Sequence, residues 1–136
     1  MGDLKIKNSL SGKKEVFKPI EAGKVSAYVC GPTVYDYGHL GHGRSAVCFD
    51  VVRRYLIYKG FSVRFVSNYT DIDDKMINRA REDGITVPEL ADKIIPTYRQ
   101  DYGALGVMPS DASPRATEYV PEMIEFLQKM ETALTL

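Results

Sequence analysis

The spacing of apolar positions changes along the chain, and each change predicts a different element. Residues 25–30 form an apolar, β-branched run that ends at Gly31, which predicts a buried strand with an abrupt end. From residue 45 onward, apolar side chains recur at helical spacing, and Gly60 follows them as a C-terminal cap. Residues 62–67 form a second short run of the strand type.

A strand, a glycine-rich loop, a helix and a second strand in succession make a βαβ unit, which requires a parallel sheet and a right-handed crossover. The predicted fold class is therefore α/β, with a Rossmann-like parallel sheet. One such unit has only half of the strands of a doubly wound sheet. We therefore expect residues 1–136 to be a single unit that forms the first half of a larger domain.

The segments on either side of this unit are simpler. Residues 1–24 form a preface in which a small hairpin turns around Gly12. The C-terminal half is predicted to be helical. Its helices are residues 73–82, which end at Gly84; a helix that opens with the capping box Thr86–Glu89 and runs toward Tyr102, with a kink or break at Pro96; and residues 118–132.

Composition and charge narrow the class of protein. With 44% hydrophobic and 26% charged residues, the chain resembles folded globular proteins rather than disordered ones. A formal net charge of zero excludes binding of nucleic acid through a chain-wide basic surface. This net charge of zero is the sum of a basic N-terminal half and an acidic C-terminal half. Residues 1–68 hold eleven Lys and Arg against five Asp and Glu, whereas residues 69–136 hold seven against thirteen.

Two cysteines, Cys30 and Cys48, do not make a disulfide framework. The apolar stretches are far shorter than the roughly 20 residues that a membrane span needs, and the N-terminus lacks the apolar region of a secretory signal. We therefore expect a cytoplasmic protein with reduced thiols and no membrane partner.

The loop from Gly38 to Ser45 holds the candidate chemistry. Ligands of open parallel sheets bind at the carboxyl ends of strands, where a helix N-terminus offers free N–H groups and a positive dipole end to an anion. His39 and His42 would add imidazole donors for charge that develops on a phosphate. The alternative is a turn whose histidines only cap the helix; the position after a strand favours nucleotide binding.

Cys30 lies at the end of the first predicted strand, on the same rim as the histidines. A thiol there is a nucleophile, a metal ligand or a core residue. Free cysteines are usually buried, whereas the open turn at residues 31–33 favours a ligand role. Cys48 lies within the predicted helix and is most simply a packing residue.

Three aspartates, Asp71, Asp73 and Asp74, follow the second predicted strand. Their spacing matches no EF-hand, and Asp at a helix start is usually a cap. We therefore interpret them as capping residues rather than as a Mg²⁺ or Ca²⁺ site. Thr70, just before them, is the better candidate for facing a ligand.

Three segments together resemble cysteinyl-tRNA synthetase, in the family's order and at family-like spacing: Tyr28–Asp36, Gly38–Arg44 and Asn68–Lys75. The similarity extends over residues 17–117 and so covers most of the chain. It implies a class I Rossmann catalytic domain. That domain activates L-cysteine with ATP and Mg²⁺ to cysteinyl-adenylate, which is then transferred to tRNA(Cys).

The resemblance also implies roles for single residues, although Leu40 stands where isoleucine is more usual. The implied residues are the catalytic pair His39 and His42; the ATP-binding set Gly38, His39, Gly41 and His42; the amino-acid-binding set Gly31, Thr33 and Thr70; and the zinc ligand Cys30.

Zinc with an open coordination position would distinguish cysteine from serine, because zinc favours a thiolate over a neutral hydroxyl. One thiol cannot hold a four-coordinate zinc. The family's further Cys, His and Glu ligands and its Lys-Met-Ser-Lys-Ser loop are absent from this sequence. We therefore interpret the chain as a monomeric N-terminal fragment of the catalytic domain. Robust cysteine-dependent ATP–pyrophosphate exchange by the chain alone would contradict this interpretation.

Three other functions remain open on the residues alone. A small nucleotidyltransferase also has a histidine pair after its first strand, and it would act on a phosphorylated acceptor but not on cysteine. A ligase that joins cysteine to an amino sugar shares the Cys-Gly and His-Leu-Gly-His features and differs in its acceptor. A non-catalytic binding module would bind neither ATP nor cysteine.

Overall fold

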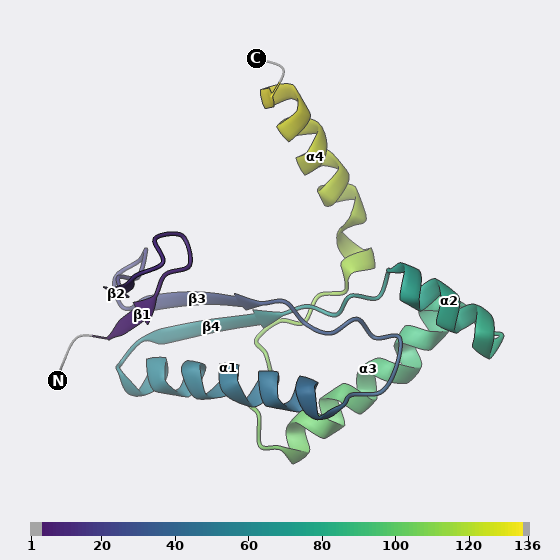
Figure 1. Cartoon of the computed structure of the whole chain (residues 1–136), viewed down its shortest axis with the longest axis horizontal. Coiled ribbons are helices and arrows are strands. Elements are labelled where there is room, and N and C mark those ends of the chain that lie inside the picture. Colours follow the sequence, from purple (N-terminus) through teal and green to yellow (C-terminus); the bar gives the residue numbers. More distant parts are fainter. Residues whose placement is uncertain (1–3, 135–136) are drawn as a thin grey trace.

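The computed structural model describes residues 4–134, which form two small sheets and several helices (Figure 1). In chain order the elements are β1 (Lys5–Lys7), β2 (Lys14–Val16), β3 (Lys24–Val29), α1 (Leu40–Tyr58), β4 (Ser62–Ser67), α2 (Asp74–Asp83), α3 (Val87–Ala104), the 3₁₀ helix η1 (Ala116–Tyr119) and α4 (Val120–Leu134). Within this part of the chain, no helix combines the length and the apolar character needed to cross a bilayer.

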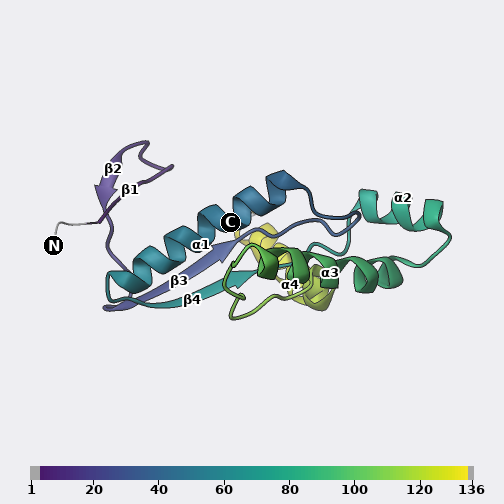
Figure 2. The ribbon, with the colours of Figure 1, turned by 90° about the horizontal axis from the view of Figure 1, so that it is seen from below.

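The centre of the fold is the parallel pair β3 and β4, with α1 lying along it (Figure 2). The register runs from Lys24 opposite Ser62 to Val29 opposite Ser67. The predicted βαβ unit and the α/β class are confirmed. The N-terminal hairpin is confirmed as well, since β1 and β2 pair antiparallel.

β3 is not the buried strand that the sequence predicts. Its residues alternate between exposed and half-buried, and the side chain of Tyr28 is 65% exposed. Alternate strand residues point to opposite faces. The exposed set Lys24, Ser26 and Tyr28 therefore lies on a face that no described element covers.

α1 begins at Leu40, five residues earlier than the apolar spacing predicts. The glycine-rich segment is therefore the first turn of a helix rather than a loop. At the other end, Gly60 follows the helix with a φ of +90°, as its predicted capping role requires.

The helices of the C-terminal half follow the predicted segments with two differences. α3 opens with the predicted reciprocal capping box of Thr86 and Glu89, but it does not break at Pro96 and continues to Ala104. Its buried face packs into the core on both sides of the proline, which holds the helix together. The last helical segment begins as the 3₁₀ turn η1 before it becomes α4.

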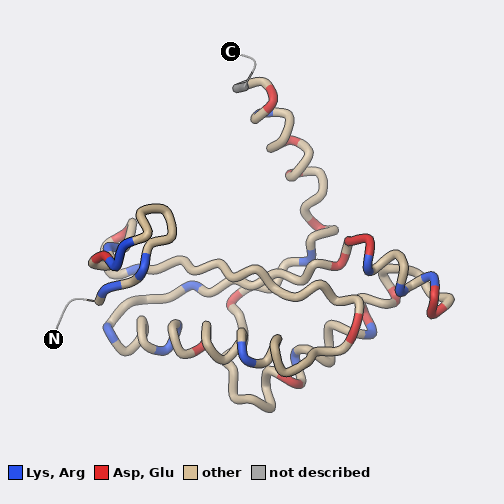
Figure 3. Tube along the Cα trace, in the orientation of Figure 1, with Lys and Arg blue, Asp and Glu red and all other residues tan. Residues whose placement is uncertain are grey.

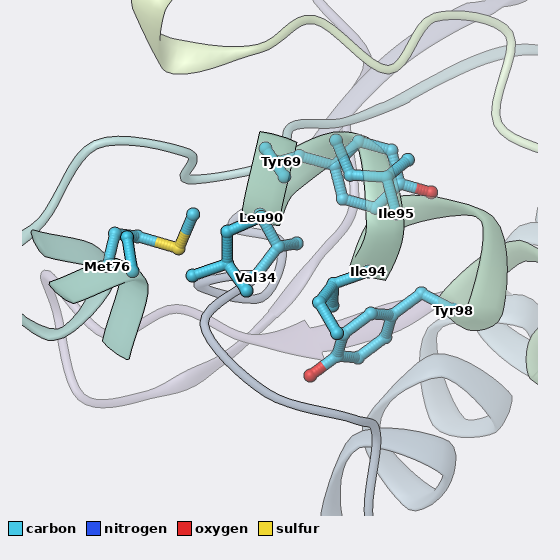
Figure 4. Packing of buried hydrophobic residues seen from close by; sticks show 9 residues of the cluster. Val34, Tyr69, Met76, Leu90, Ile94, Ile95 and Tyr98 are labelled. Carbon is cyan, nitrogen blue, oxygen red and sulfur yellow. The ribbon is translucent and has the colours of Figure 1, made fainter. Parts of the chain in front are cut away.

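The hydrophobic core lies at the carboxyl ends of β3 and β4, where α2 and α3 meet the segments that leave the strands (Figure 4). Val34 comes from the segment after β3, and Tyr69 from the segment after β4. The buried cluster consists of Val34, Tyr69, Met76, Ala80, Leu90, Ala91, Ile94, Ile95 and Tyr98. The segments that hold the candidate site residues are therefore anchored in the core.

The opposed charges of the two sequence halves are partly separated in space. Figure 3 shows basic residues gathered around the N-terminal hairpin, whereas acidic residues are frequent on α2 and α4. The separation follows from the chain's path, since the acidic half forms α2, α3 and α4.

The three aspartates after β4 have different roles. Asp73 is the cap of α2, because its side chain accepts the N–H of Lys75 at 2.8 Å. The sequence predicted that Asp71 is a capping residue too, and this prediction is wrong. It is buried and accepts both the N–H and the hydroxyl of Thr117, at 3.0 and 2.6 Å. Asp71 therefore ties the segment after β4 to η1.

Replacement of Asp73 by alanine is expected to lower the free energy of unfolding by about 1 kcal/mol, the typical cost of a lost N-cap. Urea denaturation followed by circular dichroism measures the change. The control is Asp74→Ala, which removes an exposed carboxylate from the same turn without removing the cap and is expected to cost less. A wild-type chain stabilised by Mg²⁺, with no such effect in the variant, would instead support a metal site.

Candidate functional site

The predicted site residues gather where the parallel pair meets the start of α1. A cavity of about 740 Å³ lies there, lined by β3, α1, β4, α3 and the segment after α3. Cys30, Gly31, Thr33 and His42 line it. This location agrees with the rule that ligands of open parallel sheets bind beyond the carboxyl ends of strands.

A second pocket, of about 580 Å³, lies between the first turns of α1 and the end of α3. Gly38, His39 and again His42 line it. His42 therefore borders both hollows, whereas Gly41 and Thr70 line neither.

The two histidines do cap α1. The Nδ1 atom of His39 accepts the N–H of Gly41 at 3.0 Å, and Nδ1 of His42 accepts the N–H of His39 at 3.2 Å. A neutral imidazole that accepts at Nδ1 carries its proton on Nε2. Neither Nε2 has a hydrogen-bond partner among the described residues, so capping leaves one donor on each ring available.

The expected free backbone donors at this helix start are largely absent. Besides the N–H of Gly41, those of His42 and Gly43 are engaged, since both donate to the carbonyl of His39 at 2.9 and 3.2 Å. His39 uses its side chain and its carbonyl to cap the turn, which is why these groups are not free. An anion at this end of α1 would therefore meet imidazole Nε2–H groups and the helix dipole.

The two imidazoles lie together, with ring centroids 4.0 Å apart. Burial lowers the pKa of His42, and the nearby His39 lowers it further. At neutral pH His42 is therefore an uncharged hydrogen-bond donor, a state that can stabilise developing negative charge without first losing a proton.

Acidification is expected to destabilise the chain between pH 7 and pH 5. Because the pKa of His42 is lower in the folded state than the ordinary value near 6.5, the unfolded state binds a proton first as the pH falls. The contribution of His42 to the free energy of unfolding is thus fully present above pH 6.5. It is lost as the pH falls toward the pKa of His42 in the folded state. Urea midpoints measured across this range should fall in the wild type and fall less in His42→Gln. Equal slopes would contradict the lowered pKa.

Asn68 joins the ends of the two strands, and the sequence analysis did not single it out. Its Oδ1 accepts the N–H of Gly31 at 2.8 Å and the hydroxyl of Tyr28 at 3.0 Å, and its Nδ2 donates to Oγ1 of Thr70 at 3.2 Å. The hydroxyl of Thr70 is therefore paired with Asn68, whereas Thr33 lines the cavity. The sequence signals were its position directly after β4 and at the start of the segment Asn68–Lys75.

The backbone pairing continues beyond β3 and β4. Val34 donates its N–H to the carbonyl of Thr70 at 3.1 Å, and Thr70 donates to the carbonyl of Pro32 at 3.0 Å. The segments that hold the proposed amino-acid-binding residues are thus fixed side by side. The site is built on rigid backbone rather than on free loops.

Neither cysteine is a core residue. Cys30 is exposed at the rim of the cavity, where its thiol donates a long hydrogen bond of 3.8 Å to the carbonyl of Gly31. Cys48 is exposed on α1, so the prediction that it packs is wrong. No group of three or more His, Cys, Asp or Glu side chains among the described residues is arranged to hold a metal ion. Cys30 alone does not make a zinc site, because structural and catalytic zinc needs at least three protein ligands.

An ionic brace between Arg53, which is buried, and Asp111, which is 43% exposed, lines the cavity, and the sequence analysis did not predict it. Both Asp111 oxygens lie 3.0 Å from Nη2 of Arg53, and Nη1 of Arg53 donates to the carbonyl of Pro109 at 2.6 Å. Asp111 also accepts the N–H of Phe65, in β4, at 2.6 Å. The brace therefore joins α1, β4 and the segment after α3.

Asp50 forms a second link between α1 and the segment after α3. Burial raises the pKa of this carboxyl, but hydrogen bonds from the Arg54 side chain and from the N–H of Met108 outweigh burial and hold the pKa below its ordinary value. Asp50 is therefore ionised at neutral pH and fixes α1 to the start of the segment after α3.

Comparison with known proteins identifies this arrangement. The family model for the class I (C) tRNA synthetase catalytic domain matches residues 16–134. The cysteine–tRNA ligase of Symbiobacterium thermophilum is 58% identical over 127 residues, or 93% of this chain and 27% of that protein. The cysteine–tRNA ligases of Levilactobacillus brevis and Pyrococcus horikoshii are 53% and 52% identical, over 93% and 94% of this chain and 27% of each relative.

The chain thus spans about a quarter of the length of the curated relatives that it matches. The match begins at Val16, the last residue of β2, and covers all elements from β3 to α4, including both histidines and the cavity rim. The resemblance drawn from the three sequence segments is confirmed. The chain belongs to the family of class I (C) tRNA synthetase catalytic domains.

Proposed function

We propose that the chain provides the nucleotide-binding part of a cysteine–tRNA ligase, acting in the cytoplasm, with ATP bound at the start of α1. The observation that supports this most directly is the pair of unpartnered Nε2 donors on His39 and His42, which adjoin the two pockets. Relatives named cysteine–tRNA ligase share more than half of their matched residues with the chain.

The proposed reaction is adenylate formation. A carboxylate oxygen of cysteine attacks the α-phosphorus of ATP, and pyrophosphate leaves. Negative charge increases on the α-phosphate oxygens as the bond forms, and preorganised donors stabilise charge that develops in this way. In this proposal the Nε2–H groups of His39 and His42 are those donors, while Gly38 and Gly41 allow the nucleotide to approach the turn. Transfer of the cysteinyl group to tRNA(Cys) would follow in the complete enzyme.

The amino acid would lie at the opposite rim of the cavity. Gly31 and Thr33 line this rim, and Thr70 supports it through Asn68. We propose Cys30 as one ligand of a zinc ion that would favour a thiolate over a hydroxyl. The described residues do not complete that site, so no step of the reaction is assigned to zinc, and Mg²⁺ enters only as the usual companion of ATP.

Replacement of His39 by asparagine tests the ATP site, because asparagine is a good N-cap but cannot place a donor where Nε2 of His39 lies. Calorimetry is expected to show that ATP binds the wild type and binds His39→Asn about ten- to a hundredfold more weakly, the range for a lost hydrogen bond to a charged group. The unfolding midpoint is expected to stay unchanged.

The matched control is Lys129→Ala, on α4 outside both pockets, which should leave ATP affinity unchanged. If His39→Asn binds ATP as the wild type does, the histidines only cap the helix and the proposal fails. A wild-type chain that binds neither ATP nor cysteine would instead favour a non-catalytic module. Activity with a phosphorylated acceptor but not with cysteine would favour a nucleotidyltransferase.

A further inference from the structure

We propose that Tyr98 is a positioning residue for His42. Its buried ring forms a wall that holds the imidazole in the orientation in which Nδ1 faces the backbone of His39 and Nε2–H remains free. The consequence for ATP rests on the function proposed above, whereas the effect on the imidazole does not.

The contact between the two rings carries the proposal. Tyr98, on α3, is 1% exposed, and its ring meets His42 edge to face, with centroids 5.4 Å apart and planes at 79°. Its hydroxyl lies 3.5 Å from Nδ1 of His42, at the outer limit of a hydrogen bond. Ring packing is therefore the main contact, and the hydroxyl adds little.

Tyr98 is itself held on two further sides. A side chain at Gly38 would place its Cβ 3.3 Å from Cε1 of Tyr98, so the backbone just before α1 lies directly against the ring. Tyr102, one turn further along α3, packs against the ring of Tyr98, with ring centroids 5.8 Å apart. The tyrosine ring thus has little room to move, and it can restrict the ring of His42 in turn.

The imidazole needs such a restriction. The terminal torsion of histidine is broad and roughly twofold, so the side chain alone does not select which nitrogen faces the backbone. The hydrogen bond from the N–H of His39 selects Nδ1, but at 3.2 Å it is long and lies at an exposed helix start. Packing against Tyr98 favours the same orientation from the core side.

The test compares Tyr98→Leu with Tyr98→Phe in the full chain. The imidazole signals can be assigned readily, since His39 and His42 are its only histidines. Long-range ¹⁵N–¹H NMR reports the tautomer ratio of His42, and calorimetry reports ATP affinity. In Tyr98→Leu we expect the ratio of Nε2–H to Nδ1–H to fall at least about threefold and ATP to bind about tenfold more weakly, consistent with the loss of one modest interaction. Tyr98→Phe keeps the wall and should stay within about twofold of the wild type in both.

The matched control is Ile95→Val, which trims an equally buried residue of the same helix outside the histidine contact and should change stability without changing the tautomer. If circular dichroism shows that Tyr98→Leu does not fold, Tyr98→Met, which fills more of the space, carries the same expectation. An unchanged tautomer ratio in the folded variant overturns the proposal, as does an equal fall in Tyr98→Phe. Absence of ATP binding by the wild type would refute the proposed function, while the tautomer comparison would still decide the role of Tyr98.

Discussion

Gly31→Ala is expected to lower the free energy of unfolding by about 3 kcal/mol, the upper part of the range for overpacking. A Cβ atom at this position would lie 1.7 Å from the backbone carbonyl oxygen of Asn68, a contact that no side-chain rotation relieves. The ends of β3 and β4 would have to separate, which breaks the 2.8 Å hydrogen bond from Gly31 to Asn68. Urea denaturation measures the loss. Hydrogen exchange at Val34 and Thr70, which hydrogen-bond beyond Gly31, should become faster.

Gly103→Ala is the matched control for this substitution. Gly103 lies within α3, and an added Cβ would have no atom within 4 Å. Alanine is favoured over glycine by about 1 kcal/mol in a helix interior, and Gly103 is the second-last residue of α3, so this variant should gain part of that amount over the wild type. The same chemical change therefore has opposite signs at the two positions. A mild loss in both variants would show that the strand ends can move apart at little cost.

Local signals in the sequence predicted most elements of the fold. The turn around Gly12, the Thr86–Glu89 capping box and the glycines after two helices each report the backbone within a few residues, and each is confirmed. The start of α1 was misplaced because five of residues 38–44 are glycine or histidine, a composition that is not typical of a helical turn. Histidine is not among the usual capping residues, so the cap gave no familiar signal.

The location of the core could not be predicted in the same way. Apolar periodicity shows which face of a helix is buried but not which neighbour covers it. The core therefore formed at the strand ends, around Val34 and Tyr98, while β3 itself remained partly exposed. Asp71 was misinterpreted for the same reason: its partner, Thr117, is 46 residues away in the sequence.

For the candidate site, the sequence predicted which residues lie near one another but not how their hydrogen bonds are satisfied. Cys30, Thr33 and His42 do share one cavity. The free backbone donors were not there, because His39 uses them for its own cap. Asn68 was missed because its role depends on the register that places it beside Gly31, and register is set by the whole pair of strands.

Asp111→Ala is the second large expected effect, with a loss of about 3 kcal/mol in the free energy of unfolding. The substitution leaves the guanidinium of Arg53 buried, at 6% side-chain exposure, without its carboxylate, and an uncompensated buried charge costs about 3–5 kcal/mol. We take the lower end, because the Asp111 side chain is 43% exposed and the carbonyl of Pro109 still accepts from Arg53. The N–H of Phe65 also loses its acceptor.

The double variant Arg53→Met, Asp111→Ala separates the brace from simple side-chain loss. Removing the charge together with its partner should recover part of the stability lost in Asp111→Ala, because no unpaired ion then remains buried. Glu125→Ala, which breaks the exposed ion pair with Lys129, should cost less than about 0.5 kcal/mol. Additive losses in the double variant would show that Arg53 and Asp111 contribute independently. Recovery would show that the charge pair holds this part of the cavity lining together, since its two partners join α1, β4 and the segment after α3.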